Sequence, residues 1–220
     1  MRINKFVAQA SGLSRRTADA AIAQNRVTIN GAAAEPGQEV HAGDTMTLDG
    51  KSLTLPASHT TLLFHKPIGY VTSRDGQGSR TVYDLLPPEF HRLKPVGRLD
   101  KDSSGLLLLT DDGELANRLT HPRYVKEKIY LVTLDRALTA PDQERLAAGI
   151  SLEDGLSHLK VKPQAEPTYE VRMTEGRNRQ IRRTFTALKY HVQTLHRIVF
   201  GGYVLGDLQP GDYRMIKNKE

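Results

Sequence analysis

Residues 96–113 read VGRLDKDSSGLLLLTDDG and carry the clearest information about the fold. A polar loop at 97–104 leads directly into an apolar run at 105–109. A strand without polar residues is typical of the middle of a sheet, because both of its faces are covered there. We therefore expect the loop, with Asp100 and Asp102, to be attached to a rigid element that can hold a reactive group.

Two interpretations of Asp100 and Asp102 are open. As turn residues, they would accept hydrogen bonds from nearby backbone N–H groups, helped by Ser103 and Ser104, and this is the commoner role. Alternatively, one of them is a reactive carboxylate. Arg98 could then pair with Asp100 or with a substrate. Spacing alone favours the turn.

From residue 61 onward the sequence predicts an α+β domain. Residues 168–174 alternate apolar and polar side chains, as in a strand with one buried face. Residues 177–188 place Ile181 and Phe185 on one face of a helix. By the same reasoning, we expect strands at 61–65, 105–110, 129–134 and 192–199, and helices at 114–120 and 140–148.

The first 52 residues predict a smaller module. Apolar residues at helical spacing indicate a helix at 3–10, and Ser14 can cap a second helix. Short strands at 27–29 and 45–48 are each followed by a two-residue hairpin signal, Asn-Gly and Asp-Gly. Residues 53–60 lack periodicity and are typical of a linker.

The positive charge is concentrated in two islands. The chain carries +6 overall, yet residues 1–30 hold five basic residues against one acidic, and residues 175–197 hold six against one. This pattern indicates either solvated helix faces or a polyanionic partner, with nucleic acid first. Arg15 and Arg16 favour phosphate binding, because they oppose the dipole at the expected start of a helix.

Composition and motifs exclude several classes. The chain has no cysteine, which removes disulfides, cysteine-bound metals and thiol catalysis. Its eight histidines have no metal-ligand spacing, and it has no P-loop and no GxSxG elbow. The longest pure aliphatic run has four residues and the N-terminus has no apolar signal core, so we expect a cytoplasmic protein without membrane association.

Residues 97–110 resemble, in order and spacing, the signature of the RsuA-type bacterial ribosomal-RNA pseudouridine synthases. HKPIG at 65–69, KIY at 128–130 and GRNRQIRR at 176–183 match further motifs of that family in order. His65 stands where asparagine is usual, and Ser103 keeps the hydroxyl of a common threonine.

The resemblance covers nearly the whole chain. It implies an S4 RNA-binding domain (1–52), a linker (53–60) and a pseudouridine synthase catalytic domain (61–220). That second domain should have a central mixed, mainly antiparallel sheet flanked by helices.

By this resemblance, the chain isomerises a uridine within RNA to pseudouridine. Asp100 corresponds to the catalytic aspartate, acting as nucleophile or as base at the sugar. Tyr130 corresponds to the tyrosine that packs on the base and assists removal of the C5 proton. Arg182 corresponds to the arginine that pairs with the aspartate, and Ile181 to an apolar residue of the uracil pocket. We also expect substrate contacts from Arg98, Lys66 and Arg179.

The resemblance also implies the partners. Neither cofactor nor metal is required, and the partner is ribosomal RNA or a ribosomal assembly particle. The target uridine should leave the base stack, since chemistry on a base requires access to it. We expect a monomer whose phosphate contacts come from Arg2, Lys5, Arg15, Arg16 and Arg26.

Two rival functions compete with this one. A non-catalytic RNA-binding or ribosome-assembly factor would need only the first module and would not require Asp100, Tyr130 and Arg182 together. A nucleoside or glycoside hydrolase would use Asp100 with Asp102. Carboxylates so close in one loop more often point apart than flank one bond, and a hydrolase would release free uracil.

Overall fold

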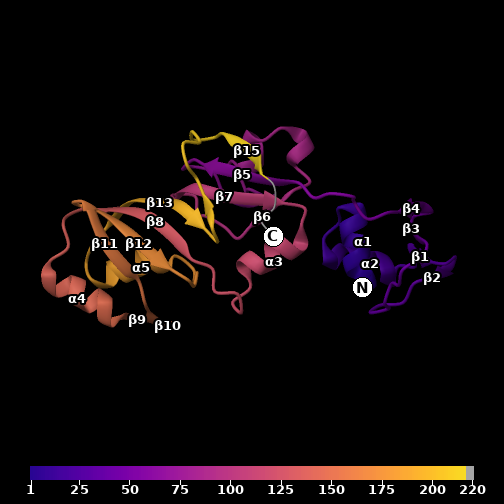
Figure 1. Ribbon diagram of the computed structural model, residues 1–220, viewed down its shortest axis with the longest axis horizontal. Helices are drawn as coiled ribbons and strands as arrows, with labels where there is room; N and C mark the ends of the chain where they lie inside the picture. The colour runs from indigo at the N-terminus through magenta and orange to yellow at the C-terminus, as the bar shows by residue number, and fades with distance from the viewer. Residues whose placement is uncertain (217–220) are drawn as a thin grey trace. The chain divides into compact units, whose positions relative to one another are not determined.

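A computed structural model describes residues 1–216, and the chain divides into two compact units (Figure 1). The first contains Met1–Thr60 with Asp111–Gly113, and the second contains Thr61–Thr110 and the chain from Glu114 onward. The division falls at the end of the expected linker.

The first unit packs two helices against a small antiparallel sheet. The helices are α1 (Ile3–Ser11) and α2 (Arg15–Ala23), and the sheet has the order β2-β1-β3-β4. Its strands are β1 (Val27–Ile29), β2 (Ala32–Ala33), β3 (Met46–Leu48) and β4 (Lys51–Leu53). Ser14 caps α2 by accepting a hydrogen bond from the N–H of Thr17 at 3.0 Å. β2 and β4 follow the two expected hairpin turns, Asn30-Gly31 and Asp49-Gly50, although no bounds were predicted for them, and β4 takes in the first residue of the expected linker.

The second unit is built on one mixed sheet with the order β11-β12-β8-β13-β7-β5-β15 (Figure 1). The strands along this path are β5 (Thr61–Lys66), β7 (Ser104–Thr110), β8 (Lys128–Leu134), β11 (Lys160–Ala165), β12 (Thr168–Met173), β13 (Val192–Phe200) and β15 (Tyr213–Ile216). β6 (Lys94–Val96) pairs with β7, and β14 (Tyr203–Val204) pairs with β13. Among the strand pairs of this sheet within residues 1–216, only β13–β7 is parallel, which confirms the expected mixed, mainly antiparallel sheet.

The β7 strand lies in the interior of this unit, as its composition predicts. Leu107 and Leu109 belong to one apolar cluster, and Leu106 and Leu108 belong to another on the opposite face. All four side chains are fully buried. The loop that precedes β7 is therefore attached to a strand that is buried on both faces.

Helices and a hairpin complete the second unit. They are α3 (Gly113–Thr120), α4 (Ala140–Ala148), α5 (Gln180–Ala187), two 3-10 turns (Val82–Leu85 and Pro88–Phe90) and the hairpin of β9 (Ile150–Leu152) and β10 (Gly155–Ser157). In Figure 1, α4 and this hairpin lie at the β11–β12 end of the sheet. The helix expected at 177–188 begins at Gln180 instead, because Arg179 adopts a left-handed conformation (φ 45°) that a helix cannot continue through.

Candidate active site

The loop that carries Asp100 is held by its backbone. All five carbonyl groups of residues 99–103 accept hydrogen bonds. The donors outside the loop are the side chains of Thr72, Lys66 and Arg182 and the backbone N–H of Gly69, at 2.7–3.0 Å. A loop bound in this way presents its side chains in one conformation, as a reactive group requires.

Lys66, at the end of β5, is the central donor to this loop. Its ammonium donates to the carbonyls of Pro67, Asp100 and Ser103 at 3.0, 3.0 and 2.7 Å. The residue is fully buried, and desolvation lowers its pKa to about 8 against the opposing charges of the loop carboxylates. Lys66 was expected to contact the substrate, but in this structure it does not line the cleft beside the loop and all three of its donors are occupied inside the protein. It is a positioning residue.

Asp100 and Asp102 have different surroundings. Arg179 grips the Asp102 carboxylate with two nitrogens at 3.1 and 2.9 Å and reaches Asp100 Oδ2 at 3.4 Å. The hydrogen bond from Arg179 is the largest of the effects that lower the pKa of Asp102. Asp102 is thus an ionised carboxylate held in a structural pair. Asp100 keeps most of its hydrogen-bonding capacity.

The expected fork–fork pair between Arg182 and Asp100 is absent. Arg182 donates to the carbonyls of Asp102 and Val192 at 2.8 Å each, and its Nε lies 3.2 Å from the Asp102 carboxylate. Burial lowers the pKa of its guanidinium. Arg182 joins α5 to the loop and to the start of β13, so in this structure it positions the loop and does not pair with Asp100.

A cleft of about 720 Å³ opens beside the Asp100 loop. Asp100 lines it, whereas Asp102 and Arg182 do not. Of the other expected site residues, the cleft brings together Arg98, Tyr130, Arg179 and Ile181. Its size suits a nucleotide. The two aspartates do not flank one space, which argues against the hydrolase interpretation.

The walls beside Asp100 are apolar where a base would lie. Tyr130 on β8 is 8% exposed and belongs to the same apolar cluster as Leu99, Met173 and Ile181, which all line the cleft. An aromatic ring among aliphatic side chains can pack against a flat base. The geometry therefore permits the expected role of Tyr130.

A loop after α3 forms the rim of the cleft. His121, Tyr124 and Val125 line it, and Val125 is 73% exposed. Arg123 lies over the Tyr124 ring, 4.4 Å from its centre, and donates a hydrogen bond to the Tyr124 hydroxyl. Arg123 is exposed and Tyr124 is half-buried. Aromatic and guanidinium planes at a surface are typical of sites that stack on unpaired bases.

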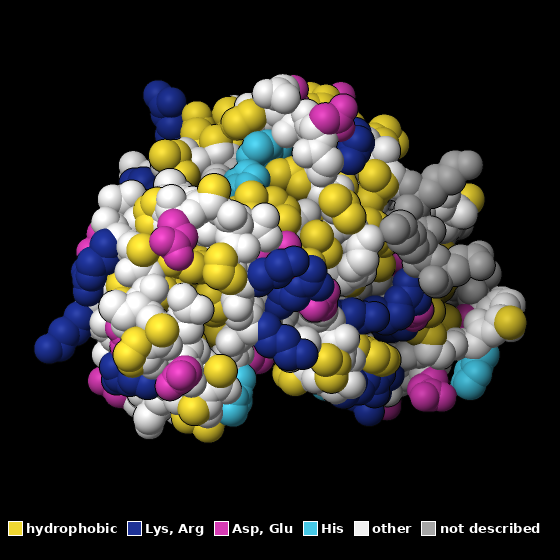
Figure 2. Space-filling model, turned by 60° about the vertical axis from the view of Figure 1, so that its left-hand side comes forward, with side chains coloured by type: hydrophobic (Ala, Val, Ile, Leu, Met, Phe, Trp, Pro, Cys, Tyr) yellow, Lys and Arg dark blue, Asp and Glu magenta, His cyan; other side chains and the backbone are white. Residues whose placement is uncertain are grey.

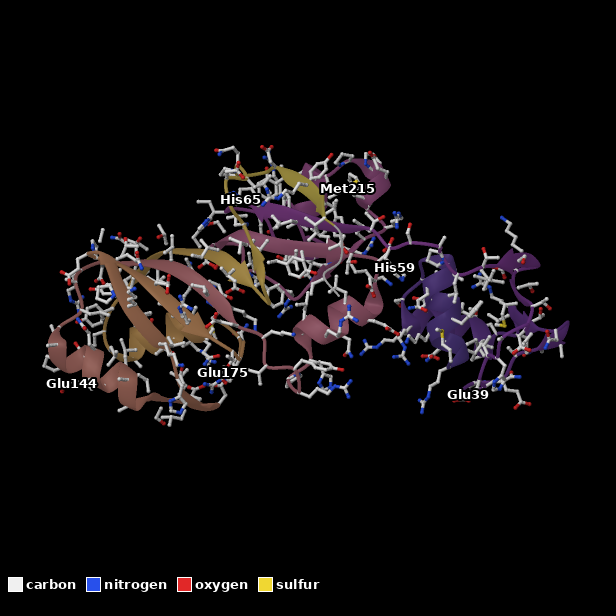
Figure 3. All side chains as sticks on the ribbon, in the orientation of Figure 1. Glu39, His59, His65, Glu144, Glu175 and Met215 are labelled. Carbon is white, nitrogen blue, oxygen red and sulfur yellow. The ribbon has the colours of Figure 1, made fainter. Side chains whose placement is uncertain are left out.

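Sequence reasoning missed Arg197, which also lines the cleft. It lies on β13, is 2% exposed and donates from Nε to the carbonyl of Leu106 at 2.8 Å. The available signal was an arginine in the middle of a predicted strand, where a charge needs a reason to be buried. Glu175, labelled in Figure 3, is the second carboxylate of the cleft. Arg177 and Gln180 donate hydrogen bonds to it.

A smaller cavity of about 460 Å³ lies between α4 and the β11–β12 edge, floored by Leu146, Leu159 and Tyr169. It contains none of the site residues expected from the sequence. Within residues 1–216, no group of three or more His, Asp and Glu side chains could hold a metal ion. No helix there is long and apolar enough to cross a membrane.

In the first unit, Arg2, Arg15, Arg16 and Arg26 are exposed and Lys5 is half-buried. Arg26 is already bound by both oxygens of Asp49, at 2.8 and 2.6 Å. Its charge is therefore matched within the protein, and it is the weakest of the expected phosphate contacts.

Comparison with known proteins identifies both units. Residues 60–187 match the family model for RNA pseudouridylate synthase, and residues 1–46 match the S4 domain. The chain is 39% identical to "Ribosomal small subunit pseudouridine synthase A" of Escherichia coli K12, covering 100% of this chain and 98% of the other. It is 37% identical to "Ribosomal large subunit pseudouridine synthase B" of Pseudomonas aeruginosa, but spans only 60% of that protein.

A solved structure described as "Crystal structure of pseudouridylate synthase" has the same fold. It superposes with a TM-score of 0.72 at 34% identity and covers 99% of this chain and 96% of the other. These matches confirm the resemblance inferred from the GRLD loop and its accompanying motifs. The chain belongs to the RNA pseudouridylate synthase family and carries an S4 domain at its N-terminal end.

Proposed function

We propose that this enzyme isomerises a uridine of small-subunit ribosomal RNA to pseudouridine, with Asp100 as the reacting carboxylate. The observation that carries the assignment of Asp100 is its position. It lines the cleft beside Tyr130 and Ile181, while its neighbour Asp102 is bound by Arg179 and does not line the cleft. The small subunit is favoured because the chain covers nearly the full length of relatives named for that subunit.

The residues of the cleft act one after another in the reaction. The Asp100 carboxylate attacks C1′ or takes a proton from the sugar, and the N1–C1′ bond breaks. The uracil turns against the ring of Tyr130, and C5 bonds to C1′ as the bond between Asp100 and C1′ breaks or, on the base route, as Asp100 returns its proton to the sugar. The C5 proton then leaves, assisted by Tyr130, while N1 takes up a proton. The cleft keeps the detached base beside the sugar, which makes its re-addition effectively intramolecular.

The target uridine enters the cleft after leaving its stack. The Tyr124 ring and the Arg123 guanidinium of the rim loop, together with Arg98, contact the flanking nucleotides. The S4 domain adds phosphate contacts through Arg2, Arg15 and Arg16. Figure 2 shows several groups of adjacent Lys and Arg side chains on one face of the molecule. The enzyme acts as a monomer in the cytoplasm, where ribosomal RNA is modified, and needs no cofactor or metal.

Release of tritium from RNA labelled at uridine C5 tests this proposal. Wild type should release it from small-subunit RNA or from assembly particles. Asp100→Asn should release less than about one-thousandth as much, because the amide can neither attack nor accept the proton. Reverse transcription after chemical tagging of pseudouridine then locates the modified nucleotide.

Asp102→Asn is the matched control, since it removes a carboxylate from the same loop outside the cleft. It should lose stability but keep measurable activity. Equal loss in both variants would contradict the assignment of Asp100. Binding of RNA without release by wild type would indicate a binding factor, and free uracil would indicate a hydrolase.

A further inference from the structure

Arg197 has no part in the reaction described so far, although it faces the place where the base should lie. It is directly opposite Tyr130 in the antiparallel β13–β8 pair. Directly opposed residues project from the same face of a sheet, with Cβ atoms about 5 Å apart. Both side chains line the cleft. A base packed on Tyr130 would therefore be within reach of the Arg197 guanidinium.

The guanidinium of Arg197 is buried without full pairing. Its Nε is bound to the Leu106 carbonyl, but neither terminal nitrogen has a hydrogen-bond partner in residues 1–216, and Nη2 is closed off from solvent. The hydroxyl of Ser103, in the same cleft, is also buried and unpartnered. The Nε of Arg177, another lining residue, is a third such atom. Buried polar groups are almost always satisfied, so unpartnered groups gathered in one cleft indicate a ligand that completes them.

The charge around Arg197 selects an anion. Lys128 lies on the same strand as Tyr130, two residues away, and both cations lie against the Phe200 ring, at 4.8 Å for Arg197 and 5.6 Å for Lys128. Desolvation, and then the charge of Arg197, lowers the pKa of Lys128. Within the described chain neither cation has a carboxylate within 4 Å. An anion between them would relieve both the burial cost and their mutual repulsion.

The reaction itself creates an anion at this position. When Asp100 displaces the base, the electron pair of the N1–C1′ bond stays on N1 and spreads onto the O2 and O4 oxygens of the uracil. The charge disappears when C5 bonds to C1′, C5 loses its proton and N1 gains one. A phosphate would instead stay charged throughout, but it would have to lie beside the ring of Tyr130, among apolar side chains.

We propose that Arg197, with Lys128 beside it, stabilises the detached uracil as an anion by donating to a pyrimidine carbonyl oxygen. This role rests on the proposed function. It makes Arg197 a catalytic residue and leaves recognition of the RNA strand to other groups.

Single-turnover kinetics with saturating enzyme test the role. Arg197→Gln should slow pseudouridine formation about 100-fold, the usual cost of one electrostatic donor. Its RNA dissociation constant should stay within about threefold of wild type, since the uridine in RNA is neutral. Arg197→Lys keeps the charge and should recover to within about tenfold. Arg145→Gln, on the exposed face of α4, is the matched control and should behave as wild type.

A phosphate role would have a different signature and would overturn the proposal. Arg197→Gln would then weaken RNA binding, reduce the dependence of log K on log salt by about 0.7, and leave the saturated rate unchanged. Thermal melting shows whether Arg197→Gln loses activity because it is misfolded. If it is, Arg197→Lys is compared with wild type instead, because a variant that keeps the charge should keep most of the activity.

Binding of free bases gives a readout that needs no turnover. 5-Nitrouracil is an anion at neutral pH and uracil is neutral. In absorbance titrations, wild type should prefer 5-nitrouracil by about tenfold or more, and Arg197→Gln should lose the preference. An absent preference in wild type overturns the proposal. A preference of wild type for 5-nitrouracil without any tritium release from RNA would contradict the proposed function but would still support the anion site.

Discussion

The ammonium of Lys66 shows how one buried charge organises the loop that carries Asp100. It reaches the carbonyls on both sides of the loop, at Asp100 and Ser103, from a strand that precedes the loop by 34 residues in sequence. A neutral amine can donate only two hydrogen bonds, so only the charged form satisfies all three carbonyl acceptors. The cost is visible in a pKa lowered from 10.5 to about 8.

This cost predicts a defined pH dependence of stability. Between pH 8 and 10.5 the unfolded chain holds a proton on Lys66 that the folded chain has released, so the free energy of unfolding rises with pH in that window. Lys66→Met lacks the group. The stability of wild type relative to this variant should therefore increase by up to about 3 kcal/mol between pH 7.5 and pH 10.5.

Urea unfolding of both proteins between pH 7.5 and pH 10.5 measures the difference in their free energies of unfolding. The contributions of the other titrating groups cancel in this difference, because both proteins contain them. A constant difference across the range would show that Lys66 does not carry the expected penalty. At neutral pH the variant should also lose at least about tenfold in activity, because the loop carbonyls lose their donor.

At the scale of the element, the parallel contact between β7 and β13 depends on one glycine. A Cβ at Gly105 would lie 2.2 Å from the carbonyl oxygen and 2.6 Å from the nitrogen of Arg197. Its φ of 105° is also a conformation that L side chains rarely adopt. The glycine lets β13 approach closely enough to place Arg197 on the cleft floor.

Gly105→Ala should therefore destabilise the second unit by at least about 3 kcal/mol, because backbone atoms of β13 must move. Gly113→Ala is the matched control: nothing lies within 4 Å of a Cβ there, and the position begins α3. That change should be neutral or stabilising by up to about 1 kcal/mol. Denaturant midpoints of the two variants decide the point, and equal midpoints would contradict the close packing.

At the scale of the whole molecule, the two basic islands have different roles. In residues 175–197 the arginines are largely bound inside the protein. Arg177 and Arg183 hold Asp154, and Arg179 holds Asp102. In the first unit, Arg15 and Arg16 have no carboxylate partner within the described residues, and Arg15 contacts only the Asn4 amide oxygen. The excess charge available to RNA therefore lies mainly in the S4 domain.

Replacing Arg15 and Arg16 together by Gln should weaken RNA binding and reduce the salt dependence of log K by about 1.4 for a single strand. The single-turnover rate at saturating enzyme should stay unchanged, because the cleft that contains Asp100 lies in the other unit. Arg26→Gln removes the same charge from a residue already paired with Asp49, so its effect on the slope should be smaller. Filter binding at several salt concentrations measures both, and equal slopes would refute the distinction.

Sequence reasoning was most successful where one local pattern determines the structure. The strand expected at 105–110 and the helix expected at 140–148 have nearly the observed bounds, because burial and capping are written in consecutive residues. It missed β11, whose residues are mostly exposed and include Pro163, since an edge strand needs no apolar alternation. It placed the start of α5 too early because Arg179 is left-handed.

The sequence by itself determined the family, the order of the two units, the buried β7 strand and the residues that line the cleft nearest to the signature loop. Only the tertiary structure decided which charged side chains are bound within the protein and which remain available to a ligand. In the folded chain Lys66 and Arg182 donate to the loop carbonyls, and Arg179 binds Asp102. Asp100 lines the cleft, and Arg197 lies opposite Tyr130. The physical reason is that a charge is satisfied by groups far away in the chain, and no local pattern records which of them will be near.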